Sequence, residues 1–141
     1  MIIIKGKPVA KNRPRFAKRG KIVVAYSDQE TESGKAYLQI LEQVRGVEPL
    51  TGALFVEISF FIARPKSHFG TGKNSGRLKP SSPKYHTKKP DVDNYIKFYF
   101  DVMNELVWRD DSQVVSVKAC KKYCGPGEIE KTQITIETIK E

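Results

Sequence analysis

Acidic residues at two places in this 141-residue sequence have a spacing that could hold a metal ion. Asp91 and Asp93 are separated by one residue, and the pair Asp110 and Asp111 follows further along the chain. Lys97 comes four residues after Asp93, which is about one helical turn. Carboxylate oxygens are the ligands that Mg²⁺ and Mn²⁺ prefer in proteins, and these ions often bind phosphate groups at the same time. The pattern therefore predicts a divalent metal ion poised on a phosphate, with a lysine nearby.

Phosphodiester hydrolysis is the reaction that these groups could catalyse. The reaction needs an attacking water in line with the leaving oxygen, and positive charge to offset the negative charge that builds on the phosphate. Lys97 could supply such a charge or donate a proton. Alternatively, Lys97 forms an ordinary ion pair with Asp93 or Asp101 on one face of a helix. The spacing supports both roles of Lys97 equally.

The charge of the chain is unevenly distributed. It has 25 Lys and Arg residues against 16 Asp and Glu residues, a net charge of +9, so a polyanion is the expected partner. Residues 1–27 and 58–90 contain eight basic side chains each and no acid, whereas residues 91–111 contain six acids and two bases. Basic side chains gain affinity for nucleic acid by releasing counterions, and a divalent cation would let the acidic segment attract phosphate as well. This pattern favours nucleic-acid binding, although either basic stretch alone could be a solvated loop.

Basic residues of the two acid-free stretches are expected to contact DNA. They are Lys11, Arg13, Arg15, Lys18, Lys73, Lys79, Lys88 and Lys89. His68 and His86 lie in the second stretch, where surface positions or phosphate contacts are expected rather than catalysis, because a metal removes the need for a histidine base. The two cysteines, Cys120 and Cys124, are too few for a zinc site or a disulfide framework.

Periodicity and turn residues predict a single α+β domain over residues 1–141. Strands are expected over 1–4, 21–25, 54–62, 114–123 and 132–138, and helices over 28–45 and from Asp91, the predicted N-cap, onward. The predicted order is β-β-α-β-α-β-β, with a mixed sheet flanked by two helices. Residues 64–90 are rich in proline, glycine and serine and are expected to form a mobile basic loop that orders when DNA binds. No apolar run is long enough to cross a membrane, so we expect a soluble, cytoplasmic protein.

The helix that begins at Asp91 is predicted to be amphipathic. Asp93, Lys97 and Asp101 fall on one face of a helical wheel, and apolar side chains fall on the other. Four bulky residues are expected to pack in the core and in a dimer interface. They are Tyr95, Phe98, Tyr99 and Phe100.

Four further residues near this helix have expected roles. Asp101 could orient Lys97, or it could be an exposed acid. Asp110 is expected to be a neighbour of the metal rather than a ligand, and Gln113 could brace Asp111. Trp108 is expected at the edge of the core, with stacking on a nucleic-acid base as the alternative.

Three segments resemble a known family. The run KKPDVDNYIKFYFDVMNELVWRDDSQVV, residues 88–115, resembles the signature of the RusA-type Holliday-junction resolvases. The N-terminal GKPVAKNRPRF, residues 6–16, is similar to the same family, and the loop over residues 64–91 is similar to its phage-related branch. The resemblance covers most of the chain.

The resemblance implies a Mg²⁺-dependent homodimer, encoded by a bacterium or a phage, that nicks two opposed strands of a four-way DNA junction. Mn²⁺ is a possible substitute for Mg²⁺. The metal-binding aspartates of the family correspond to Asp91, Asp93 and Asp111, and its catalytic lysine corresponds to Lys97. Two alternatives stay open: a basic nucleic-acid-binding module without enzymatic activity, and a nuclease for another branched DNA.

Overall fold

The computed structural model describes residues 1–12, 15–19, 22–26 and 30–141, and the side chains of residues 1–12 and 30–141. Its helices and strands, in chain order, are β1 (Ile2–Lys5), β2 (Arg15–Arg19), β3 (Ile22–Tyr26), α1 (Glu30–Val44), β4 (Leu54–Ile62), α2 (Val92–Met103), β5 (Val114–Tyr123) and β6 (Lys131–Thr138).

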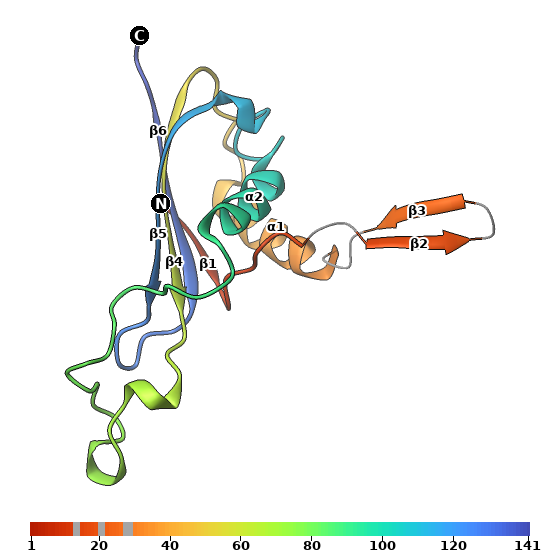
Figure 1. Ribbon diagram of the computed structural model, residues 1–141. Helices are drawn as coiled ribbons and strands as arrows, with labels where there is room; N and C mark the ends of the chain where they lie inside the picture. Colours follow the sequence, from red (N-terminus) through yellow and green to blue (C-terminus); the bar gives the residue numbers. More distant parts are fainter. Residues whose placement is uncertain (13–14, 20–21, 27–29) are drawn as a thin grey trace.

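Four strands form a mixed sheet in the order β1-β6-β4-β5. β4 is parallel to β5 and antiparallel to β6, and β1 is antiparallel to β6. Both helices lie on the same side of this sheet (Figure 1), so the predicted single α+β domain is confirmed. β3 corresponds to the strand expected over 21–25, but it pairs with β2 in a separate two-stranded sheet. β2 was not predicted, because the sequence RFAKR shows too little apolar alternation.

The core lies between the sheet and the two helices. Side chains of β4 alternate as predicted: Val56, Ile58 and Phe60 are fully buried on the helix side. Two tyrosines of α2 pack on Phe60, since the ring of Tyr95 stacks at 4.8 Å and the ring of Tyr99 lies at 5.9 Å between centroids. This packing fixes which face of α2 points into solvent.

α1 covers the outer edge of β1 through two glutamine side chains. The Gln39 Oε1 accepts a hydrogen bond from the Lys5 backbone N–H at 2.8 Å, and its Nε2 donates to the Lys5 carbonyl at 3.1 Å. Gln43 makes the same pair of bonds with Ile3, at 2.9 and 2.7 Å. The two amides therefore take the place of a neighbouring strand along β1.

The segment after β1, residues 7–12, crosses α2 and is called the strap below. The Val9 N–H donates to the Tyr99 hydroxyl at 3.0 Å, and the Lys11 N–H donates to the Asn94 carbonyl at 2.8 Å. The Lys11 ammonium also lies 2.9 Å from a carboxylate oxygen of Asp101. These three contacts fix the strap along the helix.

The loop over residues 64–90 has short structured parts at its tip and base. Two 3₁₀ helices, Lys66–His68 and Gly72–Asn74, lie in its first half, and a bridge joins Phe69 to Leu78. At the base, the His86 N–H donates to the Lys121 carbonyl and the Tyr123 N–H donates to the Lys84 carbonyl, both at 3.0 Å. The loop end therefore pairs with the last residues of β5, on the edge that the sheet leaves open.

The loop base also contains a cluster of aromatic and cationic side chains. His68 and His86 pack edge-on against the Tyr123 ring at 4.8 and 5.2 Å, and the Arg64 guanidinium lies 5.2 Å from the centre of that ring. Arg64 also donates to the Cys124 carbonyl at 2.8 Å. Partial burial, and then nearby Lys and Arg charges, lower the pKa of both histidines from the ordinary value of 6.5. Both imidazoles are therefore neutral at pH 7.

The depressed pKa values of the two histidines predict that the protein loses stability below pH 6.5. In the unfolded chain each histidine binds a proton near pH 6.5, whereas the folded protein takes it up only at lower pH, so the stabilisation is complete above 6.5 and is lost as the pH falls. These are the only two histidines in the chain. The free energy of unfolding, measured by urea titration between pH 7.5 and 5.5, should therefore fall less steeply in His86→Gln than in the wild type. Equal pH slopes would show that His86 does not titrate in this cluster.

Candidate functional site

The beginning of α2 presents two carboxylates to solvent. Asp91 occupies the N-cap position, as predicted, with an extended backbone (φ −69°, ψ 149°), but its side chain makes no capping hydrogen bond. Asp93 lies in the first turn, and both residues are exposed. Neither carboxylate is therefore needed to hold the helix end, which leaves both available for a ligand.

Lys97 lies one turn further along the same exposed face of α2. Within the described part of the chain, no carboxylate lies within ion-pair distance of its ammonium, so the structure does not form the alternative ion pair with Asp93 or Asp101. Of the two roles left open for Asp101, the structure favours the exposed acid, because Asp101 is exposed and pairs with Lys11. Lys97 is therefore a cation one helical turn from Asp93 and one from Asp101, and it forms an ion pair with neither.

Asp111 lies in a 3₁₀ turn, η3 (Asp111–Gln113), that contacts α2. The Asp110 carboxylate accepts from the Ser112 N–H at 3.2 Å, and hydrogen bonds from Ser112 lower its pKa. Asp110 therefore caps the turn, in line with its expected place beside the site rather than in it. The side chain of Asp111 itself is half-buried.

Gln113 fixes this turn from the other side. Its Oε1 accepts from the Arg109 N–H at 2.9 Å, and its Nε2 donates to the Leu50 carbonyl at 3.0 Å. The side chain of Gln113 braces the turn through backbone groups of Arg109, Leu50 and Gly52 rather than through the Asp111 carboxylate. Gln113 positions Asp111 by holding the backbone in place.

The three aspartates do not form a closed metal cage. Over residues 1–12 and 30–141, no three His, Cys, Asp or Glu side chains lie close enough together to hold an ion. Asp91 and Asp93 are at the start of α2, and Asp111 is beyond its end. The donor chemistry suits Mg²⁺, but a complete site requires the acidic residues to come closer together.

Lys121 supports the start of α2 and was not predicted from the sequence. Its ammonium donates to the carbonyls of Lys88 and Pro90, both at 2.6 Å. Pro90 directly precedes Asp91 and Lys88 lies two residues before Pro90, so Lys121 fixes the backbone that places the first carboxylate. A lysine at a half-buried strand position carries no signal that would have revealed this role.

We expect Lys121→Met to lower the apparent affinity for Mg²⁺ in the cleavage reaction and to leave the affinity for DNA unchanged. Without the two hydrogen bonds the backbone before Asp91 gains freedom, and a displaced metal ligand typically costs about 10- to 100-fold in metal affinity or activity. Cleavage rates across a Mg²⁺ series should show a higher half-saturating Mg²⁺ concentration in the variant. Lys122→Met, on the neighbouring residue of β5, is the matched control. An unchanged Mg²⁺ dependence in Lys121→Met would contradict the positioning role.

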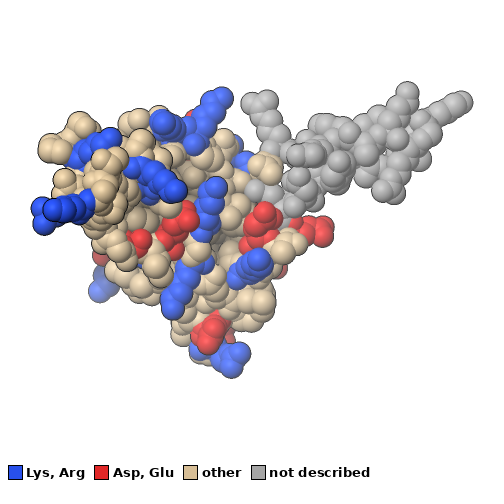
Figure 2. Space-filling view, turned by 90° about the horizontal axis from the view of Figure 1, so that it is seen from below, with Lys and Arg blue, Asp and Glu red and all other residues tan. Residues whose placement is uncertain are grey.

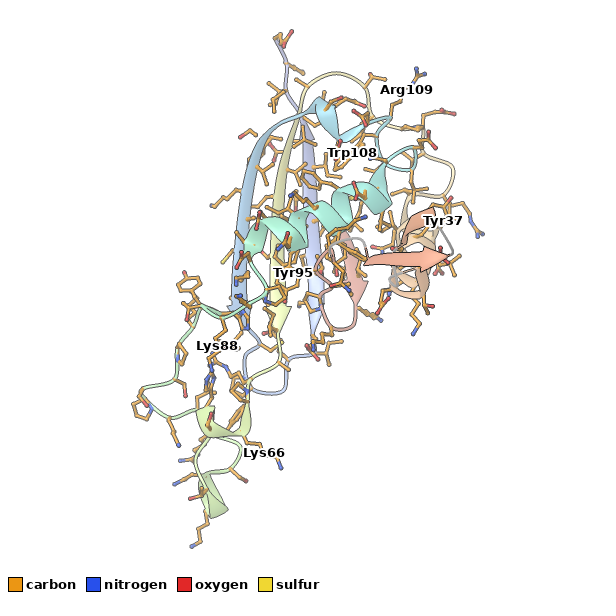
Figure 3. The ribbon with its side chains drawn as sticks, turned by 45° about the vertical axis from the view of Figure 1, so that its right-hand side comes forward. Tyr37, Lys66, Lys88, Tyr95, Trp108 and Arg109 are labelled. Atoms are coloured by element: carbon orange, nitrogen blue, oxygen red, sulfur yellow. The ribbon has the colours of Figure 1, made fainter. Side chains whose placement is uncertain are left out.

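The residues predicted to contact DNA fall into three groups. Lys73, Lys79, Lys88 and Lys89 are exposed on the loop, and Figure 3 shows Lys66 and Lys88 carried by it. Lys11 is engaged with Asp101. The side chains of Arg13, Arg15 and Lys18 lie outside the described residues. Seen from the loop end, basic side chains are spread over the described surface, with acidic ones among them (Figure 2).

The aromatic residues near α2 belong to the core. Tyr95, Phe98, Tyr99 and Phe100 are buried within the chain, as expected. Trp108 is fully buried, packs edge-on against Phe100 at 5.2 Å and donates from its Nε1 to the Asn104 Oδ1 at 2.7 Å. Its core position is confirmed, and stacking of Trp108 on a base is excluded because its ring has no exposed face.

Two further expectations concern cysteines and membranes. Cys120 and Cys124 are both free thiols. None of the helices among the described residues has the length and apolar character needed to span a membrane.

Comparisons with known proteins assign this chain to a family of nucleases. The family model for the endodeoxyribonuclease RusA matches residues 5–137. The chain is also 34% identical over 131 residues to an uncharacterized protein, YqaN, of Bacillus subtilis (strain 168), a match that covers 89% of this chain and 88% of YqaN. The matched region contains the strap, the basic loop, α2 and the η3 turn. The chain therefore belongs to the RusA endodeoxyribonuclease family.

Proposed function

We propose that this endodeoxyribonuclease is a Mg²⁺-dependent enzyme that resolves four-way DNA junctions by paired cleavage of two opposed strands. One observation carries the proposal: the start of α2 presents Asp91, which makes no capping hydrogen bond, and the exposed Asp93, and Lys97 follows on the same face with no ion-pair partner among the described residues. A plain DNA-binding surface gains nothing from carboxylates beside its basic residues, because they repel phosphate. A metal-dependent nuclease requires them.

In this proposal Asp91, Asp93 and Asp111 hold Mg²⁺, with Mn²⁺ as a possible substitute. The bound ion would offset the charge that builds on the phosphate during attack and polarise the phosphoryl oxygen. Asp91 and Asp93 lie at the start of α2 and Asp111 lies beyond its other end, so the elements that hold them must move a long way relative to one another for the three carboxylates to share one ion. Lys97 contributes a positive charge, or a proton, to the departing oxygen.

The proposed enzyme acts as a homodimer. Each chain supplies one set of three aspartates, whereas paired cleavage of a junction needs two sites that face two strands of the same molecule. A two-fold symmetric dimer is the common closed arrangement that supplies two equivalent sites.

The basic loop is proposed to follow the DNA on one side of the acidic residues. Replacing Lys73 and Lys79 with alanine should then flatten the dependence of log K on log salt concentration by about one to two units, since each phosphate contact contributes about 0.9 for duplex DNA. Both lysines are exposed, so the thermal stability should stay nearly unchanged. Junction binding across a salt series measures the slope. An unchanged slope would mean that the DNA does not follow the loop.

Cleavage assays on matched DNA substrates test the proposed function. Purified protein is incubated with four-way, three-way and linear duplexes that share the same arm sequences, with Mg²⁺ and with EDTA. We expect symmetric nicks in the four-way junction in the presence of Mg²⁺ only. Faster cutting of the three-way or linear DNA would point to another nuclease substrate, and tight binding without cutting would point to a binding module.

A further inference from the structure

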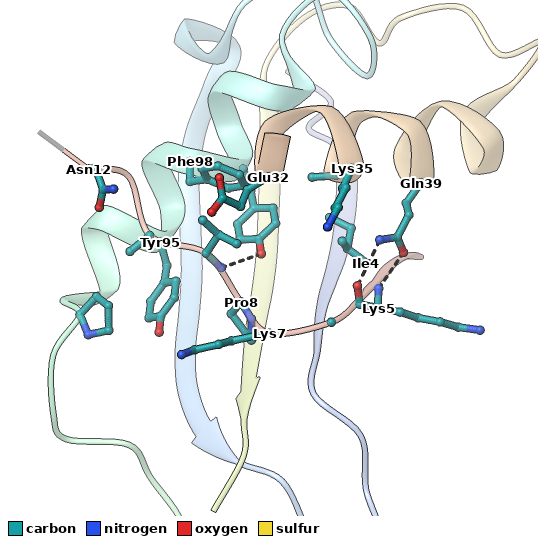
Figure 4. A pocket seen from close by; sticks show the side chains of 16 residues that line it. Ile4, Lys5, Lys7, Pro8, Asn12, Glu32, Lys35, Gln39, Tyr95 and Phe98 are labelled. Carbon is teal, nitrogen blue, oxygen red and sulfur yellow. Dashed lines mark hydrogen bonds between the residues drawn. The ribbon is translucent and has the colours of Figure 1, made fainter. Parts of the chain in front are cut away.

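A cleft of about 560 Å³ lies between the strap, α1 and the start of α2. Figure 4 shows the strap crossing in front of α2 and continuing below α1, with Lys35 and Glu32 extending from α1 toward the space beside it. Pro90 lines the same cleft and directly precedes Asp91. The cleft therefore opens next to the exposed carboxylates at the start of α2.

The walls of the cleft combine an apolar surface with charged groups. Val9, Ala36 and Phe98 line its apolar part. Lys7 and Lys35 line it as well and are both exposed, as is the carboxylate of Glu32. The side chain of Lys5 points away from the space (Figure 4), so Lys7 and Lys35 are the cations that a molecule in the cleft would meet among the described residues.

A nucleotide matches this combination of groups. Its base is flat and largely apolar, and its phosphate is an anion that ammonium groups bind. The edge of the base carries N–H groups, and a carboxylate such as Glu32 can accept hydrogen bonds from them. The volume lies in the range of small-molecule sites, which are apolar with a few convergent polar groups. A purely apolar ligand would leave the two lysines without a partner, and a phosphate alone would leave the apolar wall without one.

We propose that this cleft holds one unstacked nucleotide of the DNA substrate, next to the phosphate that is cleaved. The proposal rests on the proposed function for the nature of the substrate. Taking a base out of its stack costs less where stacking is already interrupted, as it is where the arms of an open junction meet at the branch point. Since Pro90 joins the cleft to Asp91, a nucleotide held there fixes which phosphate reaches the acidic residues.

The test uses four-way junctions that carry the fluorescent base 2-aminopurine at successive positions around the branch point. Binding is measured in EDTA, so that no cleavage is needed for the readout. With saturating wild-type protein, the fluorescence should rise about twofold or more at one position, because the base leaves its stacked neighbours. The rise should be lost in Lys35→Glu, which reverses one charge of the cleft, and in Ala36→Met, which fills it.

Arg45→Glu is the matched control, because it makes the same change of charge just beyond the end of α1, where the side chain is exposed and does not line the cleft. It should retain the fluorescence rise at the same junction saturation. If Ala36→Met does not fold, the comparison of the fluorescence rise in Lys35→Glu with that in Arg45→Glu still tests the proposal. The absence of a rise at every position in the wild type, or an equal rise in Lys35→Glu and Arg45→Glu, would overturn the proposal.

Cleavage of unlabelled junctions in Mg²⁺ separates this proposal from the proposed function. Junction cleavage without any fluorescence rise would support the resolvase activity and reject the proposal that the cleft binds a nucleotide. A variant-sensitive rise without cleavage would establish the nucleotide site and remove the resolvase activity.

Discussion

Replacing Asp93 with asparagine should abolish cleavage of four-way junctions. The change removes one charge from the proposed metal ligands, and a neutral amide binds Mg²⁺ much more weakly than a carboxylate does. Asp93 is exposed in the first turn of α2, so the free energy of unfolding should change by no more than about 0.5 kcal/mol. Junction affinity should be equal to that of the wild type or tighter, because the variant carries one negative charge less beside the phosphates. Single-turnover cleavage and a binding titration measure the two effects.

Glu105→Gln serves as the control for Asp93→Asn. Glu105 is an exposed acid just beyond the end of α2, so the variant removes the same charge from the same segment without touching the proposed ligands. It should cleave as the wild type does. A large loss of junction affinity in Asp93→Asn would instead make the acids structural, and undiminished cutting in excess EDTA would exclude a metal-dependent reaction.

Lys97→Met should lower the single-turnover cleavage rate by a factor of roughly 10² or more, the scale for losing a positioned charge or proton donor. Lys97 has no ion-pair partner among the described residues, so its removal breaks no salt bridge and the fold should be unaffected. Junction affinity should change little, since a residue that acts on the transition state contributes to the rate more than to binding.

Lys118→Met provides the comparison for Lys97→Met, because Lys118 is an exposed lysine on β5 that has no proposed role. Both variants remove one positive charge and keep a flexible side chain. A rate within about threefold of the wild type for Lys97→Met would reject its catalytic role.

The elements with strong periodicity were predictable from the sequence. β4 alternates between buried side chains and partly covered or exposed ones, and α2 separates its apolar face from Asp93 and Lys97. Both patterns come from burial of one face, which local sequence records directly. The exposed positions of Asp93 and Lys97 on α2 were predictable for the same reason.

Long-range polar contacts were not predictable. The pairing of Lys11 with Asp101 joins residues far apart in the chain. An ion pair between Lys97 and Asp101, one helical turn apart, would have a similar energy, so the sequence alone does not decide between the two pairs. The support of α2 by Lys121 and the position of Asp111 relative to Asp91 depend in the same way on how strands and helices pack. Sequence spacing places three aspartates near one helix, but it does not determine the distances between them.

The glutamine pairs on β1 also limit how chains of this protein can polymerise. A sheet that is open at both edges can add one chain after another, edge to edge, and form an open-ended filament. Here Gln39 and Gln43 already occupy the backbone groups of Lys5 and Ile3 on one edge. The other edge, β5, is covered at Lys121–Tyr123 by residues 84–86 of the loop. Residues 114–120 of β5 pair with no strand besides β4 among the described residues, and Val115 and Val117 there are 64% and 42% exposed. Pairing between four-stranded sheets can then join β5 only to β5 of a second chain, and such growth ends at two chains.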